Sequence, residues 1–296
     1  MREFSIGGWQ LVRDGIHVVQ LQPASVNAGL IIGETGVMLV DTGSSPSQGR
    51  ELAASAAELA GRPVTHVVVT HAHFDHFYGL AGVMEAAPSA VSIGHENLAA
   101  HLDGTNDPDV DPEVIRTDLG FDPSELVAPN DPMAFIRAVD LGGRVVELVH
   151  LGHGHSDSDI FVQVPDARVT FVGDMVETAS DPMVGPDSHV DTWPKAIDGV
   201  MSNAKSDTLF VPGHGPVADL EQVNNQRAAI SMLWSTAEDC IKKGMSIDDV
   251  VTDLNGPREV EWPFAPQAVA NALPWLYKAL EAQGVTKSRL LPLLGN

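Results

Sequence analysis

The segment His71-Ala72-His73-Phe74-Asp75-His76 constrains this chain more than any other stretch. It follows an apolar, β-branched run at residues 65–69, which predicts a buried strand. Side chains alternate along an extended segment, so His71 and His73 point to the same side and can share one metal ion. Asp75 and His76 come where the chain turns into a helical pattern, which suits a second ion nearby. Zinc binds both imidazole nitrogen and carboxylate oxygen, so the segment predicts a metal site at a strand end.

Size and charge restrict the partners that this chain can have. Its 296 residues are 44% hydrophobic and 19% charged, as in ordinary globular proteins, and we expect one domain over residues 1–296. The net charge is -23, and such a surface repels phosphate backbones and anionic membranes. We therefore expect a small-molecule substrate, with neither nucleic acid nor a membrane as partner. The oligomeric state is left open, with a homodimer as one alternative.

Cysteine usage and the first residues favour a cytoplasmic protein. Cys240 is the single cysteine, so the sequence contains neither a disulfide framework nor a cysteine zinc site. Residues 1–9 lack the apolar core of a signal peptide. No apolar run approaches the roughly 20 residues that a membrane span requires.

The hydrophobic pattern predicts a meander of strands, then alternating strands and helices, then helices alone. Strand patterns occur at 16–21, 28–32, 37–41, 65–69, 90–94, 144–150, 160–164, 169–172 and 208–211, and helical patterns at 47–60, 77–87, around 193–201, from 220 onward and at 268–282. Such alternation predicts sheet layers with helices outside. Residues 101–133 are rich in Asp and Pro, and only a short helix at 112–119 is expected there; such an insertion is either a lid over a site or a surface loop.

Possible metal ligands recur where predicted strands and their loops end. Beyond the first segment, these positions are Asp41, His155, Asp174 and His214. Loops at one edge of a sheet commonly carry an active site, so we expect these residues to meet. A carboxylate at a strand end, such as Asp41, often orients a histidine ligand; a helix cap or turn role is the alternative.

Together these pieces resemble the metallo-β-lactamase fold superfamily. The matching motifs, in order, are Asp41-Thr42-Gly43, His71-Ala72-His73-Phe74-Asp75-His76, Gly154-His155-Ser156, Gly173-Asp174 and Pro212-Gly213-His214-Gly215. They lie within residues 15–217, the predicted core. The resemblance implies an αββα sandwich of two face-to-face sheets with helices outside. Residues 218–296 are then a C-terminal helical extension packed on that core.

The resemblance also implies a dinuclear metal site. His71, His73 and His155 would bind one ion, Asp75, His76 and His214 the second, and Asp174 would bridge the two. His153 is an alternative to His155, but the ligand in this family follows Gly and precedes Ser or Thr, which favours His155. The expected cofactors are two Zn²⁺ ions, with iron or manganese as alternative occupants.

The chemistry implied is hydrolysis by a hydroxide held between the ions, with Asp75 holding it or moving a proton. Asp174, where the commonest zinc β-lactamases have cysteine, resembles the hydroxyacylglutathione-hydrolase-like branch and general hydrolases. We therefore expect a thioester, lactone, ester or amide substrate. A β-lactamase and a mononuclear iron persulfide dioxygenase of the same fold are the alternatives.

Substrate contacts are expected beside the ligands. Phe74, Phe77 and Tyr78 follow the metal segment, and His189 lies in the irregular loop 177–191. Of these, Tyr78 and His189 are the candidates for contact with substrate. Loops 22–27 and 177–191, together with the insertion 101–133, are the candidate lids.

Overall fold

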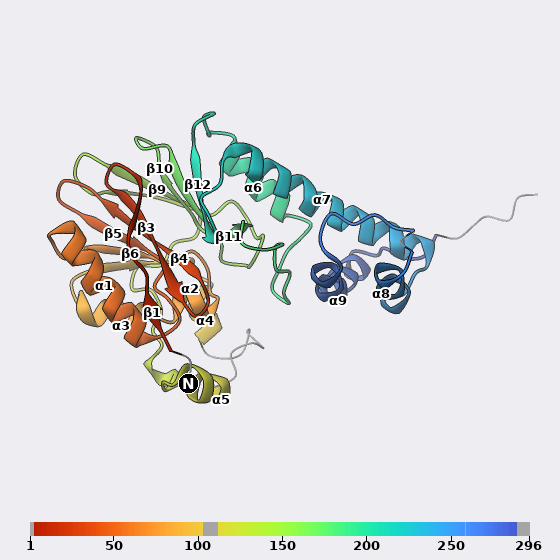
Figure 1. The fold of residues 1–296 in the computed structure, drawn as a ribbon, viewed down its shortest axis with the longest axis horizontal. Coiled ribbons are helices and arrows are strands. Elements are labelled where there is room, and N and C mark those ends of the chain that lie inside the picture. Colours follow the sequence, from red (N-terminus) through yellow and green to blue (C-terminus); the bar gives the residue numbers. More distant parts are fainter. Residues whose placement is uncertain (1–2, 103–111, 258, 289–296) are drawn as a thin grey trace, which may run out of the picture.

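The computed structural model describes residues 3–102, 112–257 and 259–288, which form a layered α/β body and a helical arm (Figure 1). One curled sheet runs in the order β7-β6-β5-β4-β12-β11-β10-β9-β8, with β3 beside β4 and with β1 and β2 beside β3. Its two halves face each other, and helices cover both outer faces. The predicted αββα sandwich is confirmed.

The N-terminal half of the body begins with an antiparallel meander and ends with parallel strands. Its strands are β1 Ser5–Ile6, β2 Gln10–Arg13, β3 Ile16–Gln22, β4 Val26–Ile32, β5 Val37–Val40, β6 His66–Val68 and β7 Val91–Ile93. Its helices are α1 Pro46–Ala60, α2 Phe74–Phe77 and α3 Leu80–Ala86. The parallel pairs β5–β6 and β6–β7 bring the ends of β5 and β6 to one edge of the sheet. Asp41 and the histidine segment follow those two ends.

The C-terminal half contains β8 Ile136–Asp140, β9 Val145–Val149, β10 Phe161–Val164, β11 Val169–Glu177 and β12 Leu209–His214, with α6 Trp193–Met201 outside. Strands β11 and β12 are parallel, so Asp174 and His214 lie near the same edge. The halves are hydrogen-bonded through β4 and β12, where Val26 pairs with His214. That single pair makes one curled sheet of what we expected to be two separate sheets.

The core between the two halves is built of aliphatic side chains from both. Ile31, Met38 and Val68 of the first half pack in one cluster with Leu148 and Val162 of the second. Phe171 lies so close over Gly29 that a β-carbon there would come within 2.2 Å of the Phe171 ring. Glycine at residue 29 therefore sets the spacing of the halves at this point.

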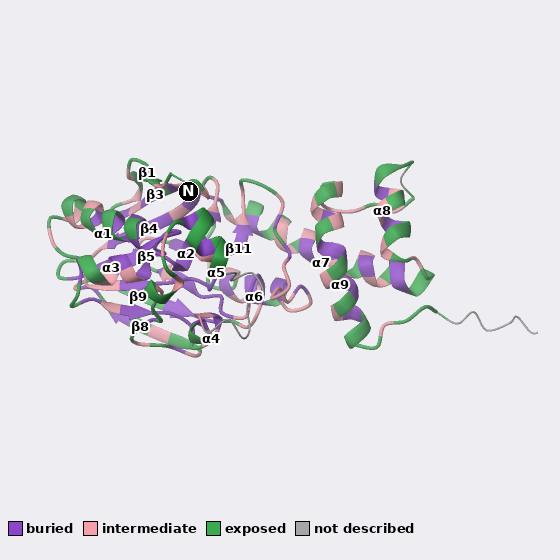
Figure 2. Ribbon diagram, turned by 90° about the horizontal axis from the view of Figure 1, so that it is seen from below, coloured by how far each residue is buried: buried purple, intermediate pink, exposed green. Residues whose placement is uncertain are grey.

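The C-terminal extension consists of α7 Leu220–Lys243, α8 Ile247–Asn255 and α9 Pro266–Ala282. Figure 1 shows α7 running outward from α6, with α8 and α9 at its far end, and Figure 2 shows the same separation from below. The arm also touches the loop after β11: the Ala265 amide donates to Asp181 (2.8 Å) and the Gln283 amide side chain donates to Asp191 (2.9 Å). The extension packs on the body through the start of α7 and this loop. Across the described ranges, no helix is both long and apolar enough to cross a membrane.

The insertion 101–133 contains more structure than its composition indicates. It includes the end of α4 Leu98–Leu102, then α5 Pro112–Val114, the π-helix η1 Ile115–Leu119 and the 3₁₀ turn η2 Pro123–Glu125. The short helix expected at 112–119 is present, with a π-helical second half. The lid prediction for residues 103–111 lies outside the described residues.

Several element predictions were wrong in detail. The helix expected at 77–87 begins only at Leu80, as α3, because the chain turns at Tyr78 and Gly79 after the separate short helix α2, which was not predicted. Strands β1, β2 and β8 were missed; β8 forms an edge of the sheet, and its charged residues Arg137 and Asp140 interrupt the apolar run that would predict a strand. Because β1 and β2 pair with β3, the sheet begins before residue 15, the predicted start of the core.

Candidate metal centre

The histidine segment is held at the mouth of the sandwich by backbone hydrogen bonds. After β6 the chain enters α2, whose first turn contains Asp75 and His76. The Thr42 hydroxyl and amide both donate to the His76 carbonyl, at 2.8 and 2.9 Å. These bonds hold the turn at residues 71–76, which we call the metal turn, against the end of β5.

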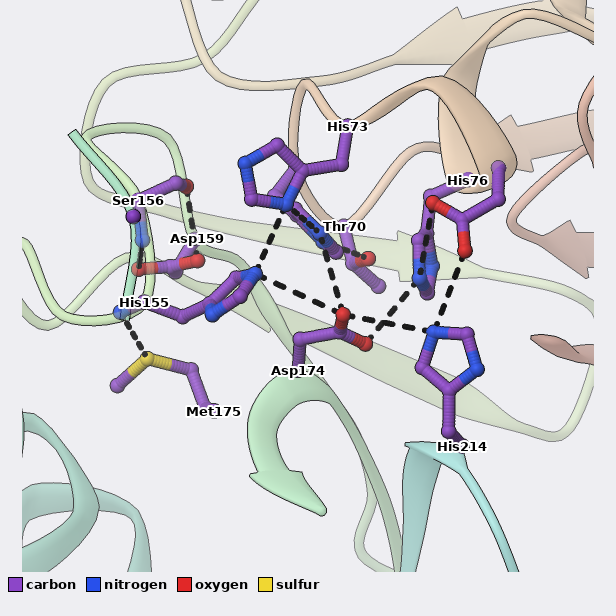
Figure 3. Close-up of polar contacts among 12 residues, drawn as sticks. Thr70, His73, His76, His155, Ser156, Asp159, Asp174, Met175 and His214 are labelled. Atoms are coloured by element: carbon purple, nitrogen blue, oxygen red, sulfur yellow. Dashed lines mark hydrogen bonds and ion pairs between the residues drawn. The ribbon is translucent and has the colours of Figure 1, made fainter. Parts of the chain in front are cut away.

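The structure brings His71, His73, His155 and Asp174 together. His73 Nδ1 lies 3.1 Å from His71 Nε2 and 2.8 Å from His155 Nε2. Asp174 Oδ2 lies 3.8 Å from His71 Nε2 and 3.6 Å from His155 Nε2. Figure 3 shows the His73 and His155 rings directed toward one point above Asp174. The four side chains offer ligand atoms within 4.8 Å of one another.

Asp75, His76 and His214 form a second group on the other side of Asp174. His214 Nε2 lies 3.3 Å from Asp75 Oδ2 and 3.5 Å from Asp174 Oδ2. His76 Nε2 lies 3.1 Å from Asp174 Oδ1. Asp174 therefore stands between the two groups, and each of its oxygens faces ligands (Figure 3). The sequence expectation of seven residues around one centre agrees with this placement.

The nitrogen and oxygen atoms of these side chains are better placed to bind cations than to form hydrogen bonds with one another. Burial, with a smaller effect of nearby His73, lowers the pKa of His155 to about 4, so its imidazole is neutral and carries a lone pair. His76 Nε2 and Asp174 Oδ1 are buried and 3.1 Å apart, but they do not form a hydrogen bond with each other, and neither has another hydrogen-bond partner among the described residues. Zinc held tetrahedrally by nitrogen at about 2.0–2.1 Å places its ligand atoms about 3.4 Å apart, close to the spacings here. The residues present fit two metal ions.

Asp41 orients the imidazoles from behind. Its Oδ2 lies 2.8 Å from His76 Nδ1 and accepts from the Thr70 hydroxyl at 2.9 Å. The same hydroxyl lies 3.0 Å from His71 Nδ1. One buried carboxylate thus holds two of the proposed ligands with their other nitrogens facing the centre. Asp41 has a positive φ of 63°, a conformation that aspartate tolerates better than most residues.

Asp187 is a site residue that the sequence analysis missed. Its Oδ2 lies 3.1 Å from His73 Nε2, the ring nitrogen opposite the one that faces the centre. Burial by itself would raise the pKa of Asp187, but the hydrogen bond and charge of His73 lower it to about 2. The loop 177–191 was predicted to flank the site, but nothing in its sequence singled out this carboxylate.

Asp159, also missed, shapes the loop that presents His155. Its Oδ2 accepts hydrogen bonds from the Gly154 and Ser156 amides at 3.1 and 2.9 Å, and its Oδ1 accepts from the Ser156 hydroxyl (Figure 3). Burial raises the pKa of Asp159 to about 7, against the lowering effect of these bonds. The run Ser156–Asp159 offered the one sequence signal, a short polar turn.

Gly213 leaves the space that Asp174 occupies. A β-carbon at residue 213 would lie 1.8 Å from Asp174 Oδ1 and 2.9 Å from the His76 ring. Any side chain at residue 213 would therefore displace the carboxylate between the two groups. The Pro-Gly-His-Gly motif thus contributes His214 and, at Gly213, the space that the Asp174 carboxylate needs.

The structure separates His153 and His189 from the two ligand groups. Their ring centroids are 4.6 Å apart, and together with His150 they line a different pocket on the outer side of the 150–155 loop. The choice of His155 over His153 agrees with this placement. His189 does not line the cavity that contains the ligands, so its predicted contact with substrate has no support in the geometry.

A cavity of about 640 Å³ opens above the ligands. Its floor contains His73, Asp75, Asp174 and His214, and Tyr78 lines its wall, as expected of a substrate contact. Glu177, at the end of β11, also lines it and was missed. Burial, with the nearby Asp174 carboxylate, raises the pKa of Glu177 to about 9.

Comparison with known proteins agrees with this site. The family described as the metallo-beta-lactamase superfamily matches residues 21–231. The chain belongs to this superfamily. Its members are metal-dependent hydrolases, and the His/Asp clusters of this chain accord with metal binding. The match ends within α7, so the far half of α7 and all of α8 and α9 lie beyond it.

Individual superfamily relatives differ in what they are named for. "Metallo-beta-lactamase type 2" of Bacillus cereus is 28% identical over 194 residues, which are 64% of this chain and 68% of the relative. "Linear primary-alkylsulfatase" of a Pseudomonas species is 25% identical over 268 residues, 77% of this chain but 49% of the relative. The matched chain thus spans about half the length of the alkylsulfatase.

Solved structures share the fold. A metallo-beta-lactamase from Pontibacter korlensis has a TM-score of 0.62 at 19% identity and covers 76% of this chain and 98% of its own. One from Hirschia baltica has a TM-score of 0.57 at 18% identity and covers 75% of this chain and 96% of its own. At these identities the likeness extends to the fold alone.

Proposed function

We propose that this protein is a dinuclear, zinc-dependent hydrolase that cleaves a carbonyl substrate: an ester, thioester, lactone or amide. The observation that carries the proposal is the pair of ligand groups that share Asp174 on the floor of one cavity. One group would hold an ion through His71, His73 and His155. The other would hold an ion through Asp75, His76 and His214, with Asp174 reaching both.

Two divalent ions at such a site supply Lewis acidity toward the carbonyl oxygen and a water whose pKa falls toward about 7. The chain's own residues supply position and proton handling. Asp75 lines the cavity, and its Oδ2 approaches His214 Nε2 at 3.3 Å. From there its carboxylate can accept a proton from the nucleophile and deliver it to the leaving atom.

The two serines along the cavity offer no competing nucleophile. Ser25 donates to the Gln22 side chain, and Ser180 donates to the Asp181 carbonyl. A serine nucleophile needs a base within hydrogen-bond reach, and neither partner is a histidine. The contacts of these two serines therefore favour the metal-dependent route.

Hydrolysis of a β-lactam is the second candidate. The observation that favours it is the 28% identity to a relative named as a metallo-beta-lactamase. A β-lactam is a strained cyclic amide, so the same residues would serve. The two candidates differ in the substrate that the cavity accepts, and a rate comparison separates them.

Metal content is the first test. We expect about two zinc ions per chain by elemental analysis of the purified protein, and fewer after His73→Ala with a parallel loss of hydrolysis. His66→Ala is the matched control, because His66 lies on β6 and bonds to Thr65 outside the centre. One iron per chain, with oxygen uptake on a persulfide, would replace hydrolysis by the dioxygenase alternative. A protein that binds no metal after reconstitution would contradict the ligand assignment.

Activity is the second test. The zinc-loaded protein is assayed with an aryl thioester, a lactone, an aryl ester and a chromogenic β-lactam. We expect at least one of the first three to be hydrolysed with a higher kcat/KM than the β-lactam. A β-lactam that is preferred over all three would place the second candidate first.

A further inference from the structure

We propose that the substrate is electrically neutral and has an apolar substituent, which lies along one wall of the site cavity. The inference rests on the proposed hydrolytic function and narrows its substrate class. It selects neutral esters, thioesters or lactones and disfavours substrates with a carboxylate or sulfate away from the scissile bond.

The wall is built of apolar side chains from three separate segments. Val114, Ile115 and Leu119 come from α5 and η1, Phe74 comes from α2, and Met183 comes from the loop after β11. The metal ligands lie on the floor beneath this wall. A substrate carbonyl placed at the ligands would therefore direct its substituent along hydrocarbon.

Two of these side chains are unusually exposed for their type. Val114 is 45% exposed and Met183 is 60% exposed. Both line the cavity, so a bound apolar substituent would cover them. Removal of apolar surface from water favours binding in proportion to the area covered, whichever apolar group does the covering. Ile115 and Leu119 beside them are buried and give the wall a fixed base.

The charges around the cavity all have one sign once the ligands are set aside. Asp118 and Glu177 line it, and none of its described lining residues is a lysine or arginine. A carboxylate at the far end of the substituent would thus lose water without gaining a lysine or arginine partner, and would face the Asp118 carboxylate.

The test compares three p-nitrophenyl esters that differ only at the end of a six-carbon acyl chain: the neutral hexanoate, the adipate monoester with a carboxylate, and the 6-trimethylammonio ester. A matching set varies the alcohol side of a hexanoate ester. We measure kcat/KM on the zinc-loaded protein. In at least one of the two sets, we expect kcat/KM of the neutral ester to be at least tenfold higher than that of the anionic ester, with the cationic ester between them. We also expect kcat/KM of that set to rise about fourfold per added methylene until the wall is covered.

A charge change at the exposed end of the wall tests the location. Met183→Lys should raise the anionic-to-neutral ratio of kcat/KM at least tenfold, and Val114→Lys should act in the same direction. Met232→Lys is the matched control: Met232 is 42% exposed on α7 and does not line the cavity, so the ratio should remain unchanged. Both test positions are surface-exposed, which limits the effect on folding.

Failure of the substrate class is distinguishable from failure of the hydrolase proposal. Alkyl aryl ketones with the same three chain ends bind without being cleaved, and ligand-observed NMR measures their affinity. Neutral ketones that bind at least tenfold more tightly than anionic ones would support the substrate class even if no ester is hydrolysed. Equal affinities and equal rates for the three chain ends, or a ratio that does not respond to Met183→Lys, would overturn it.

Discussion

Asp187 bonds to His73, which lies 114 positions earlier in the sequence. At the residue scale, contacts of this kind orient the histidine side chains of the site. A histidine ligand needs one nitrogen at the metal and a partner that fixes the other. His73 has Asp187, while His71 and His76 are both held by Asp41, one of them through Thr70. The carboxylates behind the imidazoles therefore set which ring nitrogen faces the centre.

Asp187→Asn is expected to weaken zinc binding about 10- to 100-fold, because the amide no longer fixes the His73 ring as a carboxylate does. Competition with a chromogenic chelator measures the affinity. Asp181→Asn removes the same charge from the same loop, but Asp181 bonds to the Ala265 amide in the arm, so zinc affinity should stay unchanged. Equal losses of zinc affinity in the two variants would mean that the negative charge of the loop, and not the contact with His73, sets the affinity.

Cys240 offers a second test at this scale. The side chain is fully buried in α7, and burial raises the pKa of its thiol. The reactive form is the thiolate, so a raised pKa and lack of access both slow alkylation. We expect native protein at pH 8 to react with a thiol reagent at least 100-fold more slowly than protein unfolded in guanidinium. Reaction at the unfolded rate would show that α7 opens readily.

At the scale of elements, close packing of α1 against α3 fixes the metal turn. Gly49 of α1 touches Gly79, and Gly82 of α3 touches the Pro46 carbonyl; a β-carbon at either glycine would lie within 2 Å of backbone oxygen. The Gly79 amide also donates to the Gly43 carbonyl at 2.8 Å, next to the end of β5. The turn that presents Asp75 and His76 is thus wedged between one helix and one strand end.

Gly49→Ala should destabilise the protein by about 1–3 kcal/mol or more, because the helices must separate to admit the methyl group. Chemical denaturation of the zinc-loaded protein measures the loss. Gly8→Ala is the control, since a β-carbon at residue 8 meets nothing within 4 Å. If both variants unfold at the same denaturant concentration, α1 and α3 are not packed as the structure has them.

At the scale of the whole molecule, the acidic charge and the projecting arm are the main features. The whole chain carries a net charge of -23, and the two ligand groups gather carboxylates as well. Self-repulsion of so many like charges opposes the compact state. The arm adds a second packing region, where α8 and α9 pack with the far half of α7 into one hydrophobic cluster continuous with α6.

Stability should therefore increase with ionic strength. Between 10 and 150 mM NaCl, where the Debye length falls to about 8 Å, we expect the Tm of the zinc-loaded protein to rise by about 2–4 °C for each 1 kcal/mol of repulsion relieved. KCl should give the same shift, because screening depends on ionic strength and not on ion identity. A Tm that falls with salt would mean that attractive ion pairs dominate over self-repulsion.

The sequence by itself determined the family and the layered fold, and its resemblance to that family predicted the residues of both ligand groups. The reason is local: strand and helix periodicity is written in neighbouring residues, and His71, His73, Asp75 and His76 lie within six positions of one strand end. The strand ends that carry Asp174 and His214 could be recognised in the same way.

Only the tertiary structure decided the contacts behind and above the ligands. Asp187, Asp159 and Glu177 lie in loops or at a strand end, where no periodicity marks which side chain turns inward. The break between α2 and α3 was likewise set by contacts of Gly79 with Gly43 and Gly49, which are distant in sequence. Pairing of β11 with β12 and of β4 with β12 joined the two halves of the sheet, and long-range pairing of this kind leaves no pattern in adjacent residues.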